Sequence, residues 1–153
     1  MAKKKNTNGR IDTTSLIDLI NKKAGETLAY DLTKENPTEV KDWIPTGSTW
    51  LNKIICVGNP NGGIPVSKIT ELAGLEGSGK SYMAAQIAAN AQKMGIEVVY
   101  FDSESALDPA FLEQAGCDVG RIAYTQAKTV EFVFETMEML LGETDKKILF
   151  VWV

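Results

Sequence analysis

The sequence predicts an α/β fold: a mostly parallel sheet flanked by helices, preceded by a small N-terminal helix. Strand-like and helix-like segments alternate from residue 67 to residue 153, the order expected when helices cross over a growing parallel sheet. A glycine-rich loop at residues 74–81 joins the first of these strands to the first of these helices. The apolar run at residues 148–153 is typical of a strand covered on both faces.

Composition indicates one globular unit that can bury a hydrophobic core. The chain has 153 residues, of which 44% are hydrophobic. Cys56 and Cys117 lie far apart, and no histidine is present to complete a common zinc site, so we expect a reduced, intracellular protein. No apolar run approaches the roughly 20 residues that span a bilayer. We therefore expect a cytoplasmic protein that makes no membrane contact.

Charge is unevenly distributed along the chain. The net charge is −4, and the lysines and arginine of residues 1–10 contribute +4, which leaves −8 on the remaining residues. So acidic a body is a poor general surface for nucleic acid. We expect residues 1–12 to form a disordered basic tail, with contact to a phosphate backbone as the alternative.

Residues 13–44 read as a short helix and a linker. Residues 13–15 offer a helix N-cap, residues 16–23 carry an apolar side, and Gly25 ends the helix. Such a helix needs a partner for its apolar side, either a neighbouring subunit or its own domain. Beyond the linker, residues 51–57 form a compact apolar element and residues 58–65 a loop.

The loop at residues 74–81 follows the pattern G-x-x-x-x-G-K-[ST], which is typical of a nucleotide phosphate cradle. Its glycines allow positive φ angles and a close approach of backbone N–H groups to an anion. Lys80 adds a charge for the β and γ phosphates, and the Ser81 hydroxyl is suited to ligate Mg²⁺. The alternative is a glycine-rich turn with a chance lysine. The predicted ATP-binding residues are Gly74, Leu75, Glu76, Gly77, Ser78, Gly79, Lys80 and Ser81.

Local signals place the surrounding elements. We expect strands at residues 67–73, 96–101, 121–125 and 148–153. A helix at residues 81–94 ends at Gly95, and another begins at Asp108 and Pro109 and closes at Gly116. The last predicted helix is stopped by Gly142 and carries an apolar stripe at helical spacing. The stripe consists of Val130, Val133, Phe134, Met137, Leu140 and Leu141.

Residues 45–153 resemble the RecA family, and most closely the RecA-like recombinases of bacteriophages. The resemblance rests on TGS at residues 46–48, GGIP at residues 62–65, the phosphate loop and, most specifically, FDSESALDP at residues 101–109. It implies a P-loop NTPase fold of the RecA type, with residues 45–153 as its ATP-binding core. The helix and linker of residues 13–44 match the segment that docks on the next subunit of a filament.

The resemblance also implies roles for single residues. Glu104 matches the base that orients the water attacking the γ-phosphate, with Lys80 and Mg²⁺ polarising that phosphate. Phe111 matches the ring that lies against adenine, and Asp108 an aspartate that contacts the base. In each case a structural role is the alternative: Glu104 as a turn cap or surface ion pair, Phe111 as a core residue, Asp108 as a helix cap. Asp102 is open to the same turn-capping reading.

Two departures from the family pattern matter. No aspartate follows the last apolar run to complete the Mg²⁺ site, and the DNA-binding loops and one interior strand of the family have no counterpart here. We therefore expect the chain to be a truncated, N-terminal part of a longer recombinase, with single-stranded DNA bound through regions outside it. The sheet without its interior strand is expected to fold poorly.

Three functions remain open at this point. The first is the ATP-binding part of a DNA-dependent ATPase that forms filaments and promotes homologous pairing and strand exchange, with little or no hydrolysis by this chain alone. The second is a nucleotide-binding RecA-like fragment that neither hydrolyses ATP nor binds DNA. The third keeps the fold in a helicase or a clock ATPase, which the block at residues 104–109 disfavours.

Overall fold

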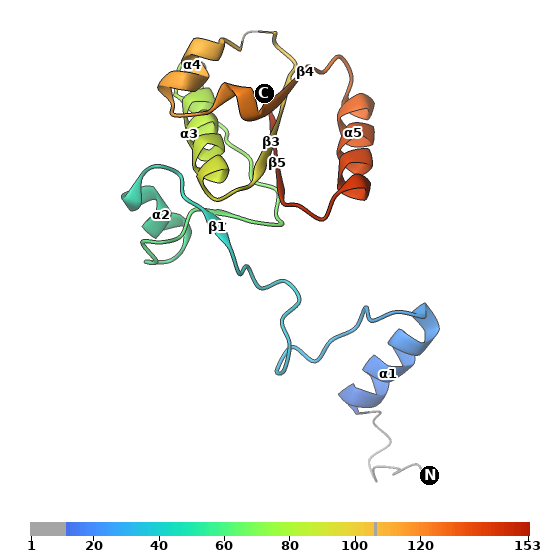
Figure 1. Cartoon of the computed structure of the whole chain (residues 1–153). Helices are drawn as coiled ribbons and strands as arrows, with labels where there is room; N and C mark the ends of the chain where they lie inside the picture. Colours follow the sequence, from blue (N-terminus) through green and yellow to red (C-terminus); the bar gives the residue numbers. More distant parts are fainter. Residues whose placement is uncertain (1–11, 106) are drawn as a thin grey trace. The chain divides into compact units, whose positions relative to one another are not determined.

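The computed structural model describes residues 12–105 and 107–153. The chain divides into two compact units, Met1–Glu39 and Val40–Val153, which are described separately (Figure 1). The basic tail predicted at residues 1–12 lies, apart from Asp12, outside the described residues. Among the residues described, no helix has the length and apolar character needed to cross a membrane.

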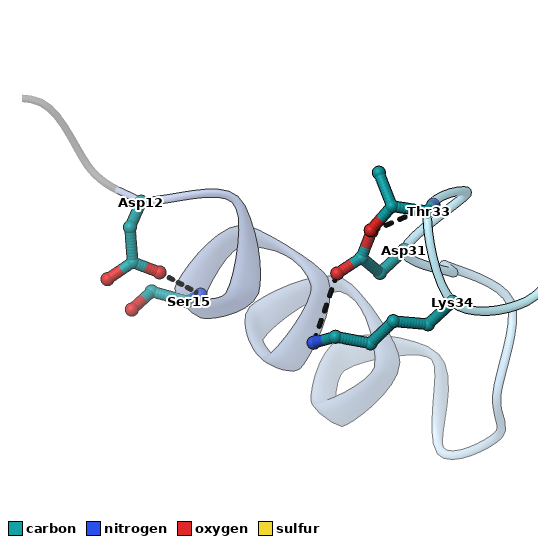
Figure 2. A network of polar contacts seen from close by, with 5 residues as sticks. All are labelled: Asp12, Ser15, Asp31, Thr33 and Lys34. Carbon is teal, nitrogen blue, oxygen red and sulfur yellow. Dashed lines mark hydrogen bonds and ion pairs between the residues drawn. The ribbon is translucent and has the colours of Figure 1, made fainter.

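The first unit contains helix α1, Thr13–Ala24. The carboxylate of Asp12 accepts a hydrogen bond from the Ser15 N–H at 2.7 Å and caps the helix (Figure 2). The prediction of a cap at residues 13–15 is therefore wrong, because Asp12 takes that role and residues 13–15 form the first turn. Gly25, with φ +78°, ends the helix as predicted.

A turn after α1 is held by Asp31. Its carboxylate accepts hydrogen bonds from the Thr33 hydroxyl at 2.6 Å and from the Thr33 N–H at 3.0 Å, and Lys34 lies 3.1 Å away (Figure 2). These contacts, with the Thr33 hydroxyl first, lower the pKa of Asp31 to about 2. The turn is thus built by local polar contacts rather than by burial.

The second unit is organised by a three-stranded parallel sheet. Its strands are β3, Glu97–Asp102, β4, Ile122–Gln126, and β5, Ile148–Trp152. They lie in the order β4-β3-β5, with β3 at the centre (Figure 1). The predicted parallel sheet is confirmed, and its carboxyl-terminal edge carries the ends of all three strands.

Helices cover the sheet on both faces. On one face α3, Lys80–Lys93, and α4, Pro109–Gln114, contribute to a core cluster with Val98 and Tyr100 of β3. On the other face α5, Val130–Glu143, packs on Val99 and Phe101 (Figure 1). Alternate residues of β3 thus enter opposite layers, which explains why the strand is apolar on both sides.

Helix α5 buries only part of the predicted apolar stripe. Val133 is fully buried, and Met137 and Leu140 pack beside it. Val130, Phe134 and Leu141 are instead more than half exposed, at 51, 58 and 59%. The helix also continues through Gly142 to Glu143. Among the described residues, the core cluster on this face takes in only part of the stripe, and Phe134 contacts the Trp152 ring edge-to-face while staying more than half exposed.

Short elements precede the phosphate loop. The two-residue strands β1, Trp43–Ile44, and β2, Ile64–Pro65, pair antiparallel. Between them lies α2, Thr49–Ile55, which accounts for most of the apolar element predicted at residues 51–57. Gly63 packs directly on β1, since a Cβ there would lie 2.0 Å from the Ile44 carbonyl oxygen.

The strand predicted at residues 67–73 is wrong. No strand is assigned to this segment, and the Ile69 side chain is 99% exposed. A strand needs a partner for its backbone N–H and C=O groups, and among the described residues β5 pairs only with β3. The apolar pattern was present, but the neighbour that would turn it into a strand is not among these residues.

We predict that Val133→Ala lowers the free energy of unfolding by about 1.5–3 kcal/mol, because it removes two buried methyl groups and leaves a cavity under α5. The matched control is Val130→Ala on the same helix, whose side chain is 51% exposed and which should cost less than about 0.5 kcal/mol. Urea denaturation measures both. Equal losses for the two variants would contradict the assignment of the buried face.

Candidate functional site

The glycine-rich loop enters α3 through two left-handed backbone positions. Gly77 and Gly79 have φ angles of +71° and +89°, and Gly79 is the N-cap of the helix. The loop turns tightly, since the Ser78 N–H donates to the Leu75 carbonyl at 3.2 Å and a Cβ on Gly74 would lie 2.8 Å from Ser78 Oγ. All residues from Gly74 to Gly79, including Glu76, are exposed.

Lys80 folds back over this loop. Its Nζ donates hydrogen bonds to the carbonyl oxygens of Gly74 and Leu75, each at 3.0 Å. Ser81 follows in the first turn of α3 and is exposed, and that turn carries no acidic residue. A full positive charge therefore lies at the N-terminus of a 14-residue helix, where the backbone N–H groups and the helix dipole also favour an anion.

Helix α4 reaches the start of α3 through an aromatic contact. The rings of Phe111 and Tyr82 lie with their centroids 6.1 Å apart at 66°, in an edge-to-face arrangement. Phe111 is partly buried against the core, and Asp108 caps α4 by accepting the Ala110 N–H at 2.9 Å. The structural roles considered for both residues are therefore present. Phe111 is at the same time brought next to the helix that the loop begins.

Asp102, the last residue of β3, is buried and holds the segment that follows it. Its Oδ1 accepts the N–H groups of Glu104 and Ser105 at 3.0 and 2.7 Å. Its Oδ2 accepts the Leu107 N–H and the Tyr124 hydroxyl, both at 3.0 Å. Burial opposes ionisation, but the hydrogen bonds from Leu107, Tyr124, Ser105 and Glu104 outweigh it and lower the pKa of Asp102.

Glu104 itself is exposed on this segment. Its N–H is fixed by Asp102, and the next residue, Ser105, has a left-handed φ of +55°, which is strained for a side chain with a Cβ. Within the described part of the chain the Glu104 carboxylate forms no ion pair with Lys80. The structure therefore brings Phe111 to the start of α3 through its contact with Tyr82, while the backbone of Glu104 is held by Asp102.

Asp102 caps the turn that carries Glu104, as one reading of the sequence allowed, but the two aromatic residues that support this segment were not singled out from the sequence. Tyr124 lies on β4 and Trp152 on β5, and Trp152 Nε1 donates to Ser103 Oγ at 2.7 Å. Their contacts depend on strand register, which the sequence does not state: Tyr124 pairs with Tyr100 and Trp152 with Phe101, next to the end of β3. A polar side chain on a strand next to the end of β3 can reach the segment after β3, which carries Glu104.

We predict that Asp102→Asn costs about 2–4 kcal/mol at pH 7, because the amide leaves buried donors without an acceptor. Since the folded pKa is depressed, the carboxylate stabilises the fold above its ordinary pKa, and this contribution is lost as the pH falls through the folded value. Urea denaturation between pH 7 and pH 2.5 should show that the difference in free energy of unfolding between Asp102→Asn and the unaltered chain becomes smaller in acid.

The control for this experiment is Asp118→Asn. Asp118 is exposed and caps a short turn through the Gly120 N–H at 3.1 Å, a role that asparagine fills equally well. A change within about 0.5 kcal/mol is expected. The difference in free energy of unfolding between Asp102→Asn and the unaltered chain should depend on pH. A difference that stays constant with pH would contradict the ionised, hydrogen-bonded state of Asp102.

Comparison with known proteins gives a consistent family. The RecA N-terminal domain family matches residues 12–151. The protein RecA of Streptomyces avermitilis is 37% identical over 107 residues, which is 70% of this chain and 27% of that protein. The protein RecA of Streptomyces coelicolor is 40% identical over 111 residues, covering 72% and 28%, and that of Aquifex pyrophilus is 37% identical over 123 residues, covering 80% and 34%. The chain thus spans about a quarter to a third of these relatives.

Proposed function

The chain belongs to the RecA N-terminal domain family, and from this premise we propose that it is the ATP-binding part of a DNA-dependent ATPase. The whole protein would form filaments on single-stranded DNA and promote homologous pairing and strand exchange in recombination and repair. The observation that carries the proposal is the loop at residues 74–81, with Lys80 folded over it at the N-terminus of α3. Among P-loop NTPase folds, the RecA type is the one this family membership favours.

ATP would bind with its phosphates in the loop. Lys80 already hydrogen-bonds two loop carbonyls, so its ammonium group has only to exchange these acceptors for phosphate oxygens. The exposed N–H groups at the start of α3 supply further donors. Ser81 would hold Mg²⁺, an ion that prefers oxygen ligands and keeps phosphate oxygens and waters in its shell. Phe111 and Asp108 are proposed to contact the adenine.

Hydrolysis would depend on position and charge rather than on covalent chemistry. Lys80 would stabilise the charge that develops on the transferred phosphoryl group. Glu104 would accept a proton from the attacking water, or orient that water, from the exposed segment after β3. A nucleotide-binding module without hydrolysis is the second candidate, favoured by the fact that the Glu104 segment is fixed by Asp102 rather than by any residue of the phosphate loop.

The test uses four variants of the whole protein that the reading frame encodes. Lys80→Ala should weaken binding of a fluorescent ATP analogue at least about 10-fold, because a charge-assisted contact is lost. Glu104→Gln should keep binding within about 2-fold and lower turnover, measured with and without single-stranded DNA, by about 100-fold or more. Lys68→Ala and Glu113→Gln, both at exposed positions outside residues 74–81 and 103–107, are the matched controls.

Two results would decide against the first candidate. Tight ATP binding by Lys80→Ala would contradict the assignment of the loop as the site that binds the phosphates. Unchanged turnover in Glu104→Gln would contradict the assignment of Glu104 as the general base. ATP binding by the unaltered protein without DNA-stimulated turnover would favour the nucleotide-binding module that does not hydrolyse ATP.

Self-association into filaments is proposed for helix α1. The helix has no buried residue, and Leu16, Leu19 and Ile20 on its apolar side are 44, 59 and 51% exposed. An amphipathic helix gains stability by burying such a side, which a neighbouring copy can provide. Packing on its own domain is the alternative. We propose three segments: the basic tail at residues 1–12, the docking helix and linker at residues 13–44, and the ATP-binding core at residues 45–153.

We predict that replacing Leu16, Leu19 and Ile20 together by serine shifts the protein towards the monomer. Sedimentation velocity across a range of concentrations measures the shift, which should raise the dissociation constant by about 100-fold or more, since three apolar side chains lose their burial. The control replaces Thr13, Asp18 and Lys22 of the same helix by alanine. An unchanged sedimentation profile for the serine variant would favour packing of α1 on its own domain.

Two finer assignments complete the proposal. A closer likeness to the recombinases of bacteriophages than to bacterial RecA is inferred from the sequence, and alignment against both groups tests it. A cytoplasmic location is inferred from composition, and fractionation of cells that express the chain tests that. A helicase or clock ATPase role on the same fold would appear as DNA unwinding or slow, DNA-independent turnover.

A further inference from the structure

The segment that carries Glu104 is tied to both neighbouring strands by side-chain hydrogen bonds. From β4, the Tyr124 hydroxyl donates to Asp102 Oδ2 at 3.0 Å. From β5, Trp152 Nε1 donates to Ser103 Oγ at 2.7 Å, and the Ser103 N–H donates to the Val153 carbonyl at 2.8 Å. The two residues directly before Glu104, Asp102 and Ser103, are therefore each tied to a neighbouring strand.

Neither aromatic residue is explained by burial alone. Tyr124 is 45% exposed and Trp152 43% exposed, although the Trp152 ring packs edge-to-face on Phe134 with centroids 6.2 Å apart. Large aromatic side chains that stay half exposed commonly owe their position to the polar group at their tip. Here each tip is directed at the segment after β3, and Trp152 and Ser103 line a shallow depression of about 410 Å³ at the strand ends.

The tethered backbone is strained. Ser105 adopts φ +55°, a conformation that costs a residue with a Cβ of the order of 1–2 kcal/mol in an unconstrained chain. The Ser105 N–H is bound by Asp102 Oδ1 at 2.7 Å, and Asp102 in turn shares its second oxygen between Leu107 and Tyr124. Strained backbone persists where surrounding contacts over-determine it, and such segments cluster at functional sites.

We propose that Tyr124 and Trp152 are positioning residues that aim the Glu104 carboxylate. Trp152 fixes Ser103 just before Glu104. Tyr124 fixes the Asp102 carboxylate, which in turn holds the N–H groups of Glu104, Ser105 and Leu107. The inference rests on the proposed function, in which Glu104 acts on the attacking water. A base that is misplaced by about 1 Å can lose up to about 100-fold in rate. The two tethers act on the segment from opposite neighbours of β3, and each should contribute separately to this placement.

The alternative is that the two rings serve only as packing. Two variants separate the possibilities because they delete one hydrogen bond and keep the ring. Tyr124→Phe removes only the hydroxyl, and Ser103→Ala removes the acceptor of Trp152 while the indole stays in place. The matched controls are Thr136→Val on α5 and Thr144→Val at its C-terminal end, which each lose one hydroxyl hydrogen bond outside the 103–107 segment.

Two readouts are needed. Amide hydrogen exchange, measured without nucleotide, should show the amides of Glu104, Ser105 and Leu107 exchanging about 3- to 10-fold faster in both variants, as expected when one hydrogen bond is lost. With single-stranded DNA and ATP, kcat of the whole protein should fall about 10-fold while KM for ATP stays unchanged. The double variant should lose more than either single variant.

The outcomes separate this inference from the function it builds on. Turnover that survives Glu104→Gln overturns the proposed function and this inference together. Normal kcat in Tyr124→Phe and Ser103→Ala, beside a Glu104→Gln variant that has lost turnover, overturns the inference alone. Exchange rates that match those of the controls also overturn it, because the tethers would then not hold the segment.

Discussion

One buried carboxylate, that of Asp102, accepts four hydrogen bonds at the end of the central strand, and the geometry of the candidate site depends on it. Three donors are N–H groups of the segment that follows, and the fourth is a hydroxyl from β4. A buried carboxylate is costly unless its lone pairs are satisfied, so the segment and the charge stabilise each other. This mutual dependence keeps Ser105 in a strained conformation and Glu104 at the surface.

The sheet explains why the carboxylate is at this position. β3 lies between two parallel partners and is buried on both faces, so its end is fixed by neighbours on every side. Segments at the carboxyl ends of parallel strands are where such folds bind ligands. Residues 67–73, which lead into the phosphate loop, pair with no described strand. The contact of Phe111 with Tyr82 connects α4 to the helix that the loop begins.

Much of the fold could be predicted because its signals are local. Gly25, Gly95 and Gly116 adopt positive φ angles near helix ends, and Asp108 caps α4, as their positions in the sequence indicate. The strand at residues 96–101 was predicted from its β-branched and aromatic residues, and the strand at residues 148–153 from an unbroken apolar run. The phosphate loop was found from its pattern. Of its three glycines that were expected to allow positive φ angles, Gly77 and Gly79 adopt them and Gly74 does not.

What could not be predicted depends on neighbours that are distant in sequence or are not among the described residues. The pattern at residues 67–73 is that of a strand, but pairing needs a partner, and the exposure of Ile69 reflects its absence there. The apolar stripe of α5 was drawn from spacing alone, whereas contact with the sheet buries Val133 and leaves Phe134 exposed. The hydrogen bonds of Tyr124 and Trp152 arise from strand register, which the sequence does not state.

The central claim is that the loop at residues 74–81 binds the phosphates of a nucleotide. The most direct measurement is a titration of the ¹⁵N-labelled chain with Mg²⁺ and ATP, followed by amide chemical shifts, with Mg²⁺ and adenosine as the parallel titration. The account predicts that the amides of Gly77, Gly79, Lys80 and Ser81 shift with ATP and stay in place with adenosine. Shifts confined to other parts of the chain, or equal shifts with both ligands, would contradict it.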